Sequence, residues 1–151
     1  MKKNEFIRNA VIIFILTLLF YVAGYNWIEH RRHFKGPWEV VFVTQTNGEC
    51  SMRITQPALQ ISQTLKFAGE KSKGPATEVK MRFEQPILEL PSEVPFGKVI
   101  YQDLTFLPGV VTMHLFSHDI ELLPRVLIVD KSEYPWRAGS EVVATNLVPS
   151  P

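Results

Sequence analysis

Four side chains of the kinds that bind metal ions lie close together in the last third of the chain: His114, His118, Asp119 and Glu121. Imidazole and carboxylate groups are ligands that zinc and copper accept. On a continuous strand His114 and His118 would share a face, because side chains alternate between the two faces of a strand. The apolar Met113 and Leu115 are expected to face a core, however, which turns His114 outward. Residues 117–119 (Ser-His-Asp) have the composition of a turn. We therefore expect structural or solvent-facing histidines, with a metal site as the weaker alternative.

Cys50 is the only cysteine in the chain. It cannot form an intrachain disulfide, and we expect a half-buried free thiol. A blue-copper site needs a Cys closely followed by His and Met, which Cys50 lacks. The sequence also lacks Gly-x-Ser-x-Gly, His-Glu-x-x-His and the glycine-rich phosphate loops. We predict a protein that is not an enzyme and holds no cofactor. A hydrolase is a third alternative, and it would require buried carboxylates or histidines with shifted pKa values that face one cleft.

The chain that must position these residues begins with an uncharged apolar stretch, residues 9–28 (NAVIIFILTLLFYVAGYNWI). Twenty helical residues reach about 30 Å, the thickness of the hydrocarbon core of a bilayer. We predict a transmembrane helix. A cleaved signal peptide is the alternative, but the apolar stretch is longer than the apolar region of a usual signal peptide, and an Ala-x-Ala cleavage site is absent.

The flanks of this helix have the composition of a membrane interface. Aromatic and basic residues that suit the interface are Tyr21, Tyr25, Trp27, Arg31, Arg32 and Lys35. Basic residues on the two sides of the helix balance, so charge does not set the orientation. We expect residues 1–8 to form a short cytoplasmic tail and the C-terminal domain to be extracytoplasmic, on the periplasmic side in a bacterium.

Three small residues of the helix, Ala10, Thr17 and Gly24, recur every seven positions and therefore share one face. Such a face allows a partner helix to approach closely. Bulky residues share the face and no Gly-x-x-x-Gly pair is present, so chance occurrence is the simpler interpretation. We retain the three as partner-binding candidates.

After a juxtamembrane linker, residues 29–36, the apolar residues of the chain recur every second position, which is typical of strands. Residues 78–84 (EVKMRFE) alternate most strictly, and the runs 40–43 and 126–129 are apolar on both faces. Asn47-Gly48 favours a type I′ hairpin turn. We predict that residues 37–145 form an all-β, antiparallel, immunoglobulin-like sandwich of seven to nine strands.

A short internal repeat relates residues 52–61 (MRITQPALQI) to residues 81–90 (MRFEQPILEL). Each copy has the pattern of a strand, a proline break and a second strand. If the resemblance reflects duplication, the two copies should occupy similar corners of the fold.

Two tryptophans that each follow a proline, Trp38 and Trp136, lie near the two ends of this segment. We predict that they close the ends of the core, with an aromatic platform for a partner or a sugar as the alternative. The proline-rich tail, residues 146–151, is expected to be disordered or to lie along a neighbouring protein.

Composition excludes several classes of protein. The chain is 46% hydrophobic and has a net charge of only +1, which argues against intrinsic disorder and against nucleic-acid binding. These features lead us to expect a single-pass membrane protein that contacts the bilayer and other subunits of a membrane complex, as an accessory or assembly component. The alternative is an extracytoplasmic ligand-binding or carrier domain for a sugar, a lipid or a metal.

Overall fold

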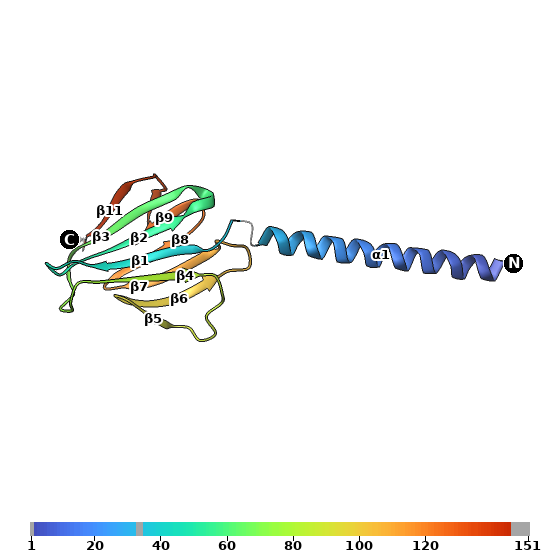
Figure 1. Ribbon diagram of the computed structural model, residues 1–151, viewed down its shortest axis with the longest axis horizontal. Coiled ribbons are helices and arrows are strands. Elements are labelled where there is room, and N and C mark those ends of the chain that lie inside the picture. Colours follow the sequence, from blue (N-terminus) through green and yellow to red (C-terminus); the bar gives the residue numbers. More distant parts are fainter. Residues whose placement is uncertain (1, 33–34, 146–151) are drawn as a thin grey trace. The chain divides into compact units, whose positions relative to one another are not determined.

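The computed structural model describes residues 2–32 and 35–145, which belong to two compact units. The first unit is one helix, α1 (Lys2–Arg32), coloured blue in Figure 1. Its 31 residues extend beyond the predicted 9–28 at both ends, so the first part of the expected linker is helical. At about 1.5 Å per residue the helix is about 46 Å long. The tail at 146–151 lies outside the described residues.

The second unit is mostly strand, and its first sheet, sheet A, has the strand order β11-β3-β2-β1-β4. Its strands are β1 (Trp38–Thr44), β2 (Glu49–Gln56), β3 (Ile61–Lys71), β4 (Thr77–Phe83) and β11 (Ser140–Thr145). A short 3-10 helix, η1 (Pro57–Leu59), separates β2 from β3. Neighbouring strands pair antiparallel except β11, which pairs with β3 in parallel. The prediction of a wholly antiparallel domain is therefore wrong at this edge.

Sheet B has the strand order β10-β9-β8-β7-β6-β5, and its neighbouring strands pair antiparallel. Its strands are β5 (Ser92–Val94), β6 (Gly97–Asp103), β7 (Val110–Leu115), β8 (His118–Leu122), β9 (Val126–Val129) and β10 (Ser132–Pro135). The described part of the domain thus holds eleven strands, more than the predicted seven to nine. Several of the additional strands are only three or four residues long.

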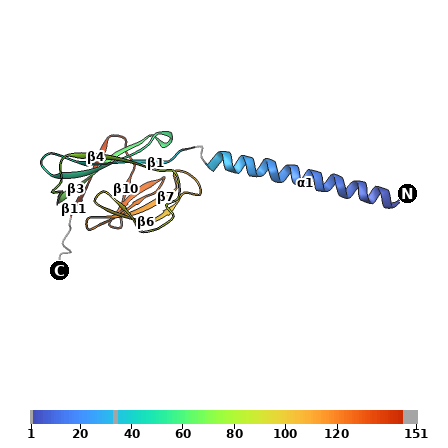
Figure 2. The same cartoon turned by 60° about the horizontal axis from the view of Figure 1, so that its bottom comes forward.

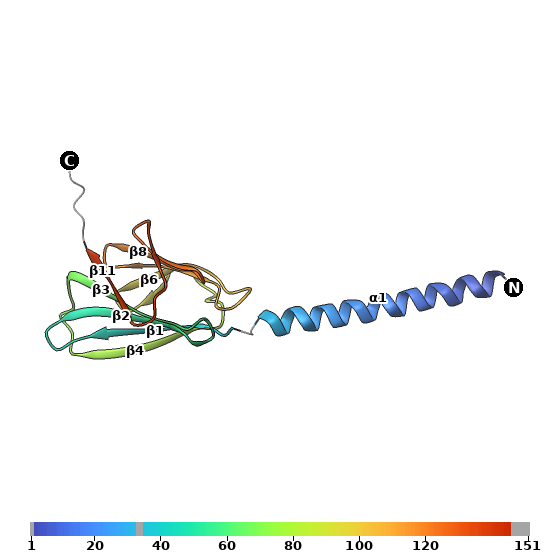
Figure 3. The same cartoon turned by 90° about the horizontal axis from the view of Figure 1, so that it is seen from above.

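The two sheets form two layers, which can be followed in Figure 2 and, seen from above, in Figure 3. Inward-facing residues of both layers make one core, since every second residue of a strand points to the same face. Its largest fully buried apolar side chains are Trp38, Phe42, Met52, Ile54, Leu65, Met113, Leu115, Ile120, Leu122 and Leu127. The apolar runs 40–43 and 126–129 are buried at alternate residues only, so they are covered on one face and not on both.

β4 keeps the predicted alternation, but its position at the edge of sheet A reduces the burial of its apolar face. Phe83 is buried, Met81 is half-buried and Val79 is 41% exposed. The two copies of the internal repeat begin alike, because β2 and β4 flank β1 on its two sides. They then diverge: residues 57–59 form η1, whereas residues 84–91 form no helix or strand. The expected similar corners are therefore absent.

Turn geometry departs from the prediction at the first hairpin. Gly48 has a φ of +86° and its N–H donates to the carbonyl of Gln45 at 3.0 Å. Asn47 keeps a negative φ, and its side-chain oxygen accepts from the N–H of Glu49 at 3.0 Å. A type I′ turn requires positive φ at both central residues, so the turn is of another type, with one left-handed glycine before β2.

Candidate functional site

Helix α1 is long and apolar enough to cross a membrane, and no part of the chain that the structure describes buries its membrane-length window. Tyr21, Tyr25 and Trp27 are each at least 60% exposed. The guanidinium of Arg31 lies over the ring of Trp27, 4.4 Å from its centroid, which is a cation–π contact. The side chain of Arg32 lies outside the described part of the structure. An apolar helix with an aromatic and basic end matches the pattern of an interfacial anchor.

The three small residues of α1 leave their face open. The Thr17 hydroxyl donates to the carbonyl of Ile13 at 2.8 Å, within the helix. A Cβ added at Gly24 would meet no atom within 4 Å. Ala10 is exposed as well. No other described element covers this face, although bulky residues share it, and helix pairing there stays an untested alternative.

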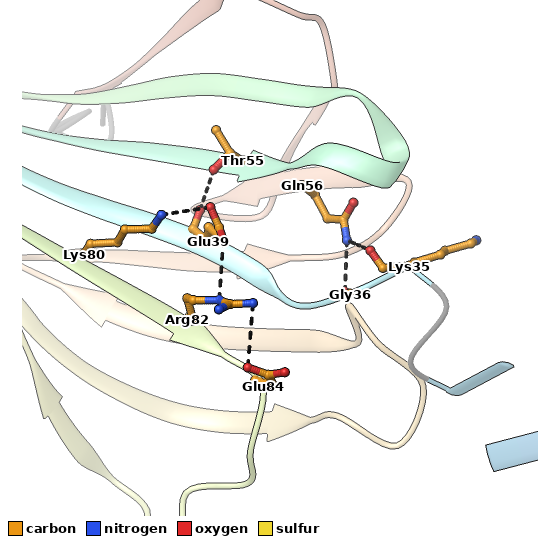
Figure 4. Close-up of polar contacts among 8 residues, drawn as sticks. All are labelled: Lys35, Gly36, Glu39, Thr55, Gln56, Lys80, Arg82 and Glu84. Carbon is orange, nitrogen blue, oxygen red and sulfur yellow. Dashed lines mark hydrogen bonds and ion pairs between the residues drawn. The ribbon is translucent and has the colours of Figure 1, made fainter. Parts of the chain in front are cut away.

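The first residues of the β domain are bound by a buried glutamine, Gln56, at the end of β2 (Figure 4). Its Nε2 donates to the carbonyl oxygens of Lys35 and, at 2.9 Å, Gly36. Its Oε1 accepts from the N–H of Leu59 at 3.0 Å, which caps η1. One amide side chain therefore joins the incoming chain, β2 and η1. Lys35 belongs to this unit, and not to a free linker.

The outer face of sheet A beside this junction is charged. Glu39 of β1 pairs with Lys80 at 3.2 Å and with Arg82 at 3.5 Å, both on β4, and Arg82 also approaches Glu84 (Figure 4). The backbone carbonyl of Glu39 accepts from the hydroxyl of Thr55 at 3.3 Å. Exposed pairs of this kind contribute at most about 1 kcal/mol each, so this face provides solubility more than stability.

The two tryptophans contact each other, with ring centroids 5.4 Å apart, and do not close opposite ends of the core. Trp38 is fully buried and its Nε1 donates to the carbonyl of Gly109 at 3.0 Å. Trp136 is half-buried and its Nε1 donates to the carbonyl of Leu123 at 2.8 Å. Sequence separation concealed this pairing. Trp38 offers no exposed platform, whereas Trp136 keeps a partly exposed ring.

The four candidate metal ligands do not converge on one point: His114 pairs with Asp119, whereas His118 pairs with a carboxylate outside the set of four. His114 faces outward, as its apolar neighbours predicted, and its Nδ1 lies 2.7 Å from Oδ1 of Asp119. His118 is not in a turn but begins β8 with its side chain buried. Its Nδ1 lies 2.5 Å from Oδ2 of Asp130, a residue that the sequence analysis did not single out. Glu121 lies on the outward face of β8.

Within the described residues no three His, Cys, Asp or Glu side chains are grouped so that they could hold a metal ion. The reason is local: consecutive residues 118 and 119 point to opposite faces of β8. Asp130 fixes the buried histidine further, because its Oδ1 accepts from the N–H of Asp119 at 2.9 Å. Nε2 of His118 is buried without a hydrogen-bond partner among the described residues.

Comparisons with protein-family models, with curated proteins and with solved structures find no match.

Two cavities lie along sheet A, and both are near the lower limit for small-molecule sites, about 300 Å³. One of about 290 Å³ adjoins Cys50 and residues 66–71, where the pairing of β2 with β3 is irregular. The other, about 270 Å³, adjoins Gln63, Tyr134 and Arg137. Neither is lined by Trp136 or by the histidines to which the sequence analysis assigned a ligand. Cys50 is buried, more deeply than predicted, and its Sγ lies 3.5 Å from the carbonyl of Gly48.

Exposed apolar side chains of the β domain are the functional candidates that sequence analysis missed. β6 contains an irregularity between Val99 and Tyr101 that leaves Ile100 without a partner on β7. Ile100 is 42% exposed and Tyr101 is 53% exposed. A bulge bends its strand and changes the direction of its side chains, and bulges are frequent next to functional sites. The alternation of a strand predicts one of these two residues to be inward, so their pattern gave no signal.

The pKa of Asp103, at the end of β6, is lowered from its ordinary value. Hydrogen bonds from the backbone and the side chain of Thr105 favour the charged carboxylate, and desolvation opposes them weakly because the group is exposed. The Thr105 N–H donates to Oδ1 of Asp103 at 3.0 Å. This carboxylate orders the start of the loop after β6.

Proposed function

We propose that this protein is a membrane-anchored, non-catalytic interaction module, an accessory or assembly subunit of a larger membrane complex. The observation that supports it best is α1, whose apolar window is exposed along its whole length. An apolar helix exposed to water has a high free-energy cost, and a bilayer removes that cost. The proposal includes insertion of α1 as a single-pass signal-anchor and an extracytoplasmic, periplasmic-side location of the β domain.

The contact surface that we assign to a partner protein is the outer face of sheet B around the β6 bulge, where Ile100 and Tyr101 are exposed. Beside them lies the exposed His114–Asp119 pair. Aromatic and aliphatic side chains surrounded by polar groups are the composition of the central part of protein interfaces. A partner in the same bilayer meets this face at a raised effective concentration, so a small contact suffices. The immunoglobulin-like type of sandwich also belongs to this proposal, supported by the two-layer arrangement of the sheets.

The test combines purification with crosslinking. The tagged full chain and a chain that starts at Lys35 are purified in mild detergent, and bound proteins are identified by mass spectrometry. A partner retained only by the full chain indicates binding by α1, and one retained by both indicates the β domain. Recovery of the bait alone from both preparations would contradict the proposal.

A photoreactive residue in place of Tyr101 then tests the assigned face. The matched control is a photoreactive residue in place of Arg53, an exposed position on β2 of sheet A. We expect a discrete adduct with the same partner from position 101 and none from position 53. Equal labelling from both positions would remove the assignment to sheet B.

A further inference from the structure

Two loops of the β domain, residues 84–91 and 104–109, each expose a large apolar side chain. Leu88, in the loop 84–91 after β4, is 97% exposed, and Phe106, in the loop 104–109 after β6, is 61% exposed. β1 begins at Trp38, which pairs with Phe83 at the end of β4. The loop 84–91 therefore starts at the end of the domain where the chain arrives from α1, and the hydrogen bond from Trp38 Nε1 to the carbonyl of Gly109 places the loop 104–109 at the same end.

The loop 104–109 is anchored to the core. Phe106 is exposed although the backbone on either side of it is held in place. Leu104 and Leu107 on either side of it are buried in the core. The carbonyl of Gly109 accepts from Nε1 of Trp38 at 3.0 Å. The loop therefore holds the ring of Phe106 outside the core while its neighbours are anchored inside.

The loop 84–91 is fixed in the same way. Ile87 packs against the core, and its carbonyl accepts from Nε2 of Gln102 at 3.4 Å. Gln102 is the penultimate residue of β6, and Phe106 follows soon after it. This hydrogen bond therefore brings the loop of Leu88 next to the end of β6, from which the loop of Phe106 starts.

Only a few residues of the sequence separate the end of α1 from the first residue of the β domain. α1 ends at Arg32, and Gln56 binds the carbonyls of Lys35 and Gly36. Three residue steps from Arg32 to Lys35 span at most about 11 Å at 3.6 Å per residue. A bilayer crossed by α1 would thus lie within reach of the two loops.

We propose that Leu88 and Phe106 insert into the surface of the bilayer that α1 crosses, as a second, reversible contact between the β domain and the lipid. This inference rests on the proposed anchoring by α1. The loop 84–91 carries the acidic residues Glu84 and Glu89, the loop 104–109 follows Asp103 at the end of β6, and neither loop contains a basic residue. Apolar insertion therefore drives the contact, and headgroups without net charge, such as phosphatidylcholine, are the surface that it fits.

The experiment uses the full chain reconstituted into phosphatidylcholine vesicles, with an environment-sensitive fluorophore on Leu88→Cys. The control places the fluorophore on Ser132→Cys, an exposed position beside the Asp130 turn at the other end of sheet B. Cys50 is 3% exposed, so the wild-type chain treated with the same reagent serves as the labelling blank. The readouts are the emission wavelength and quenching by lipids brominated in their acyl chains.

We expect the label at position 88 to emit at shorter wavelength than the label at 132. It should lose about half of its emission to brominated lipid, because interfacial side chains lie within about 10 Å of the acyl chains. Phe106→Asp in the position-88 background should reduce this quenching, whereas Val143→Asp, at an exposed valine of β11, should not. Adding phosphatidylglycerol to the vesicles should weaken the quenching or leave it unchanged.

Three results would overturn the inference. Water-like emission from both labels would show that the loops stay in solution. A short emission wavelength at position 88 without bromine quenching would show that protein covers the loops. Quenching that appears only with phosphatidylglycerol would show an electrostatic contact instead. Whether the chain stays with the same vesicles in alkaline carbonate measures the anchoring by α1 separately. Loss of anchoring is therefore distinguishable from loss of the loop contact.

Discussion

The side-chain amide of Gln56 donates to the carbonyl oxygen of Gly36 at 2.9 Å, so the end of β2 binds the second residue of the β domain. A buried amide with its donor and its acceptor both used is stabilising, whereas its loss leaves several backbone groups without partners. The second compact unit of the chain begins at Lys35, and Gln56 is the residue whose side chain binds its first two carbonyl groups.

Gln56→Leu should destabilise the β domain by about 2 to 3 kcal/mol, because the carbonyls of Lys35 and Gly36 and the N–H of Leu59 lose buried partners. The matched control is Gln85→Leu. Gln85 precedes a proline in the second copy of the internal repeat but is exposed, so its replacement should change stability by less than about 0.5 kcal/mol. Urea unfolding of the full chains in mild detergent, followed by tryptophan fluorescence, measures both. Equal stability of the two variants would contradict the structural role of Gln56.

Trp38→Phe should cost about 2 kcal/mol, since it removes the donor to the carbonyl of Gly109 and part of a fully buried ring. Trp136→Phe should cost less, because that ring is half-buried and water can reach the site. The same unfolding experiment compares them. A larger loss of unfolding free energy for Trp136→Phe than for Trp38→Phe would contradict this prediction, because the less buried ring would then contribute more to stability.

Zinc at equimolar concentration should neither bind measurably in calorimetry nor raise the thermal midpoint of the full chain. His114 and His118 face opposite sides of sheet B and each is engaged by its own carboxylate, Asp119 or Asp130. The control is His114→Ala, which should behave as the wild type does in the same titration. A wild-type isotherm that this variant abolishes would restore the metal hypothesis.

Local patterns in the sequence predicted the strands and the directions of their side chains where one face is covered. Met113 and Leu115 point inward and His114 outward, and Trp38 to Thr44 forms a strand, because the two-residue period is a property of each strand alone. Pairing between distant segments was not predictable in this way. The parallel partner of β3 is β11, and nothing in residues 140–145 indicates its neighbour or its direction.

Long-range packing also overrides local turn preferences at two phenylalanines. Phe96 and Phe116 have φ values of +72° and +53°, which usually favour glycine. Their rings stack 5.2 Å apart, and the N–H of Phe116 donates to the carbonyl of Phe96 at 2.8 Å. The interaction between the two turns offsets the strain in each. The exposed Leu88 escaped prediction for a related reason, since composition alone does not show whether an apolar side chain is covered.

Thermal stability should fall on acidification in a way that depends on Asp103. Hydrogen bonds from Thr105 lower the pKa of Asp103 in the folded state, so the carboxylate form is the stabilising one. The contribution is fully present above the ordinary pKa of 3.8 and is lost as pH falls through the lower folded pKa. Asp103→Asn should therefore reduce the thermal midpoint slightly at pH 7 and leave it unchanged relative to wild type well below that pKa. Differential scanning calorimetry across this range is the check, and a difference that grows on acidification would reverse the sign.

Leu16→Arg should displace α1 from the membrane, because Leu16 lies near the middle of the apolar stretch and is exposed, so the arginine would have no protein partner there. A central arginine disfavours insertion by about 2.5 to 3.5 kcal/mol relative to apolar residues. The variant should move largely into the alkaline carbonate supernatant, whereas Leu16→Phe should remain in the pellet. Gly24→Leu supplies a further comparison, because this variant should also stay in the pellet. It should nevertheless weaken any association that uses the face of Ala10, Thr17 and Gly24, because a bulky side chain prevents close approach of a second helix. A Leu16→Arg chain that stays in the pellet would mean that the lipid contact does not depend on α1.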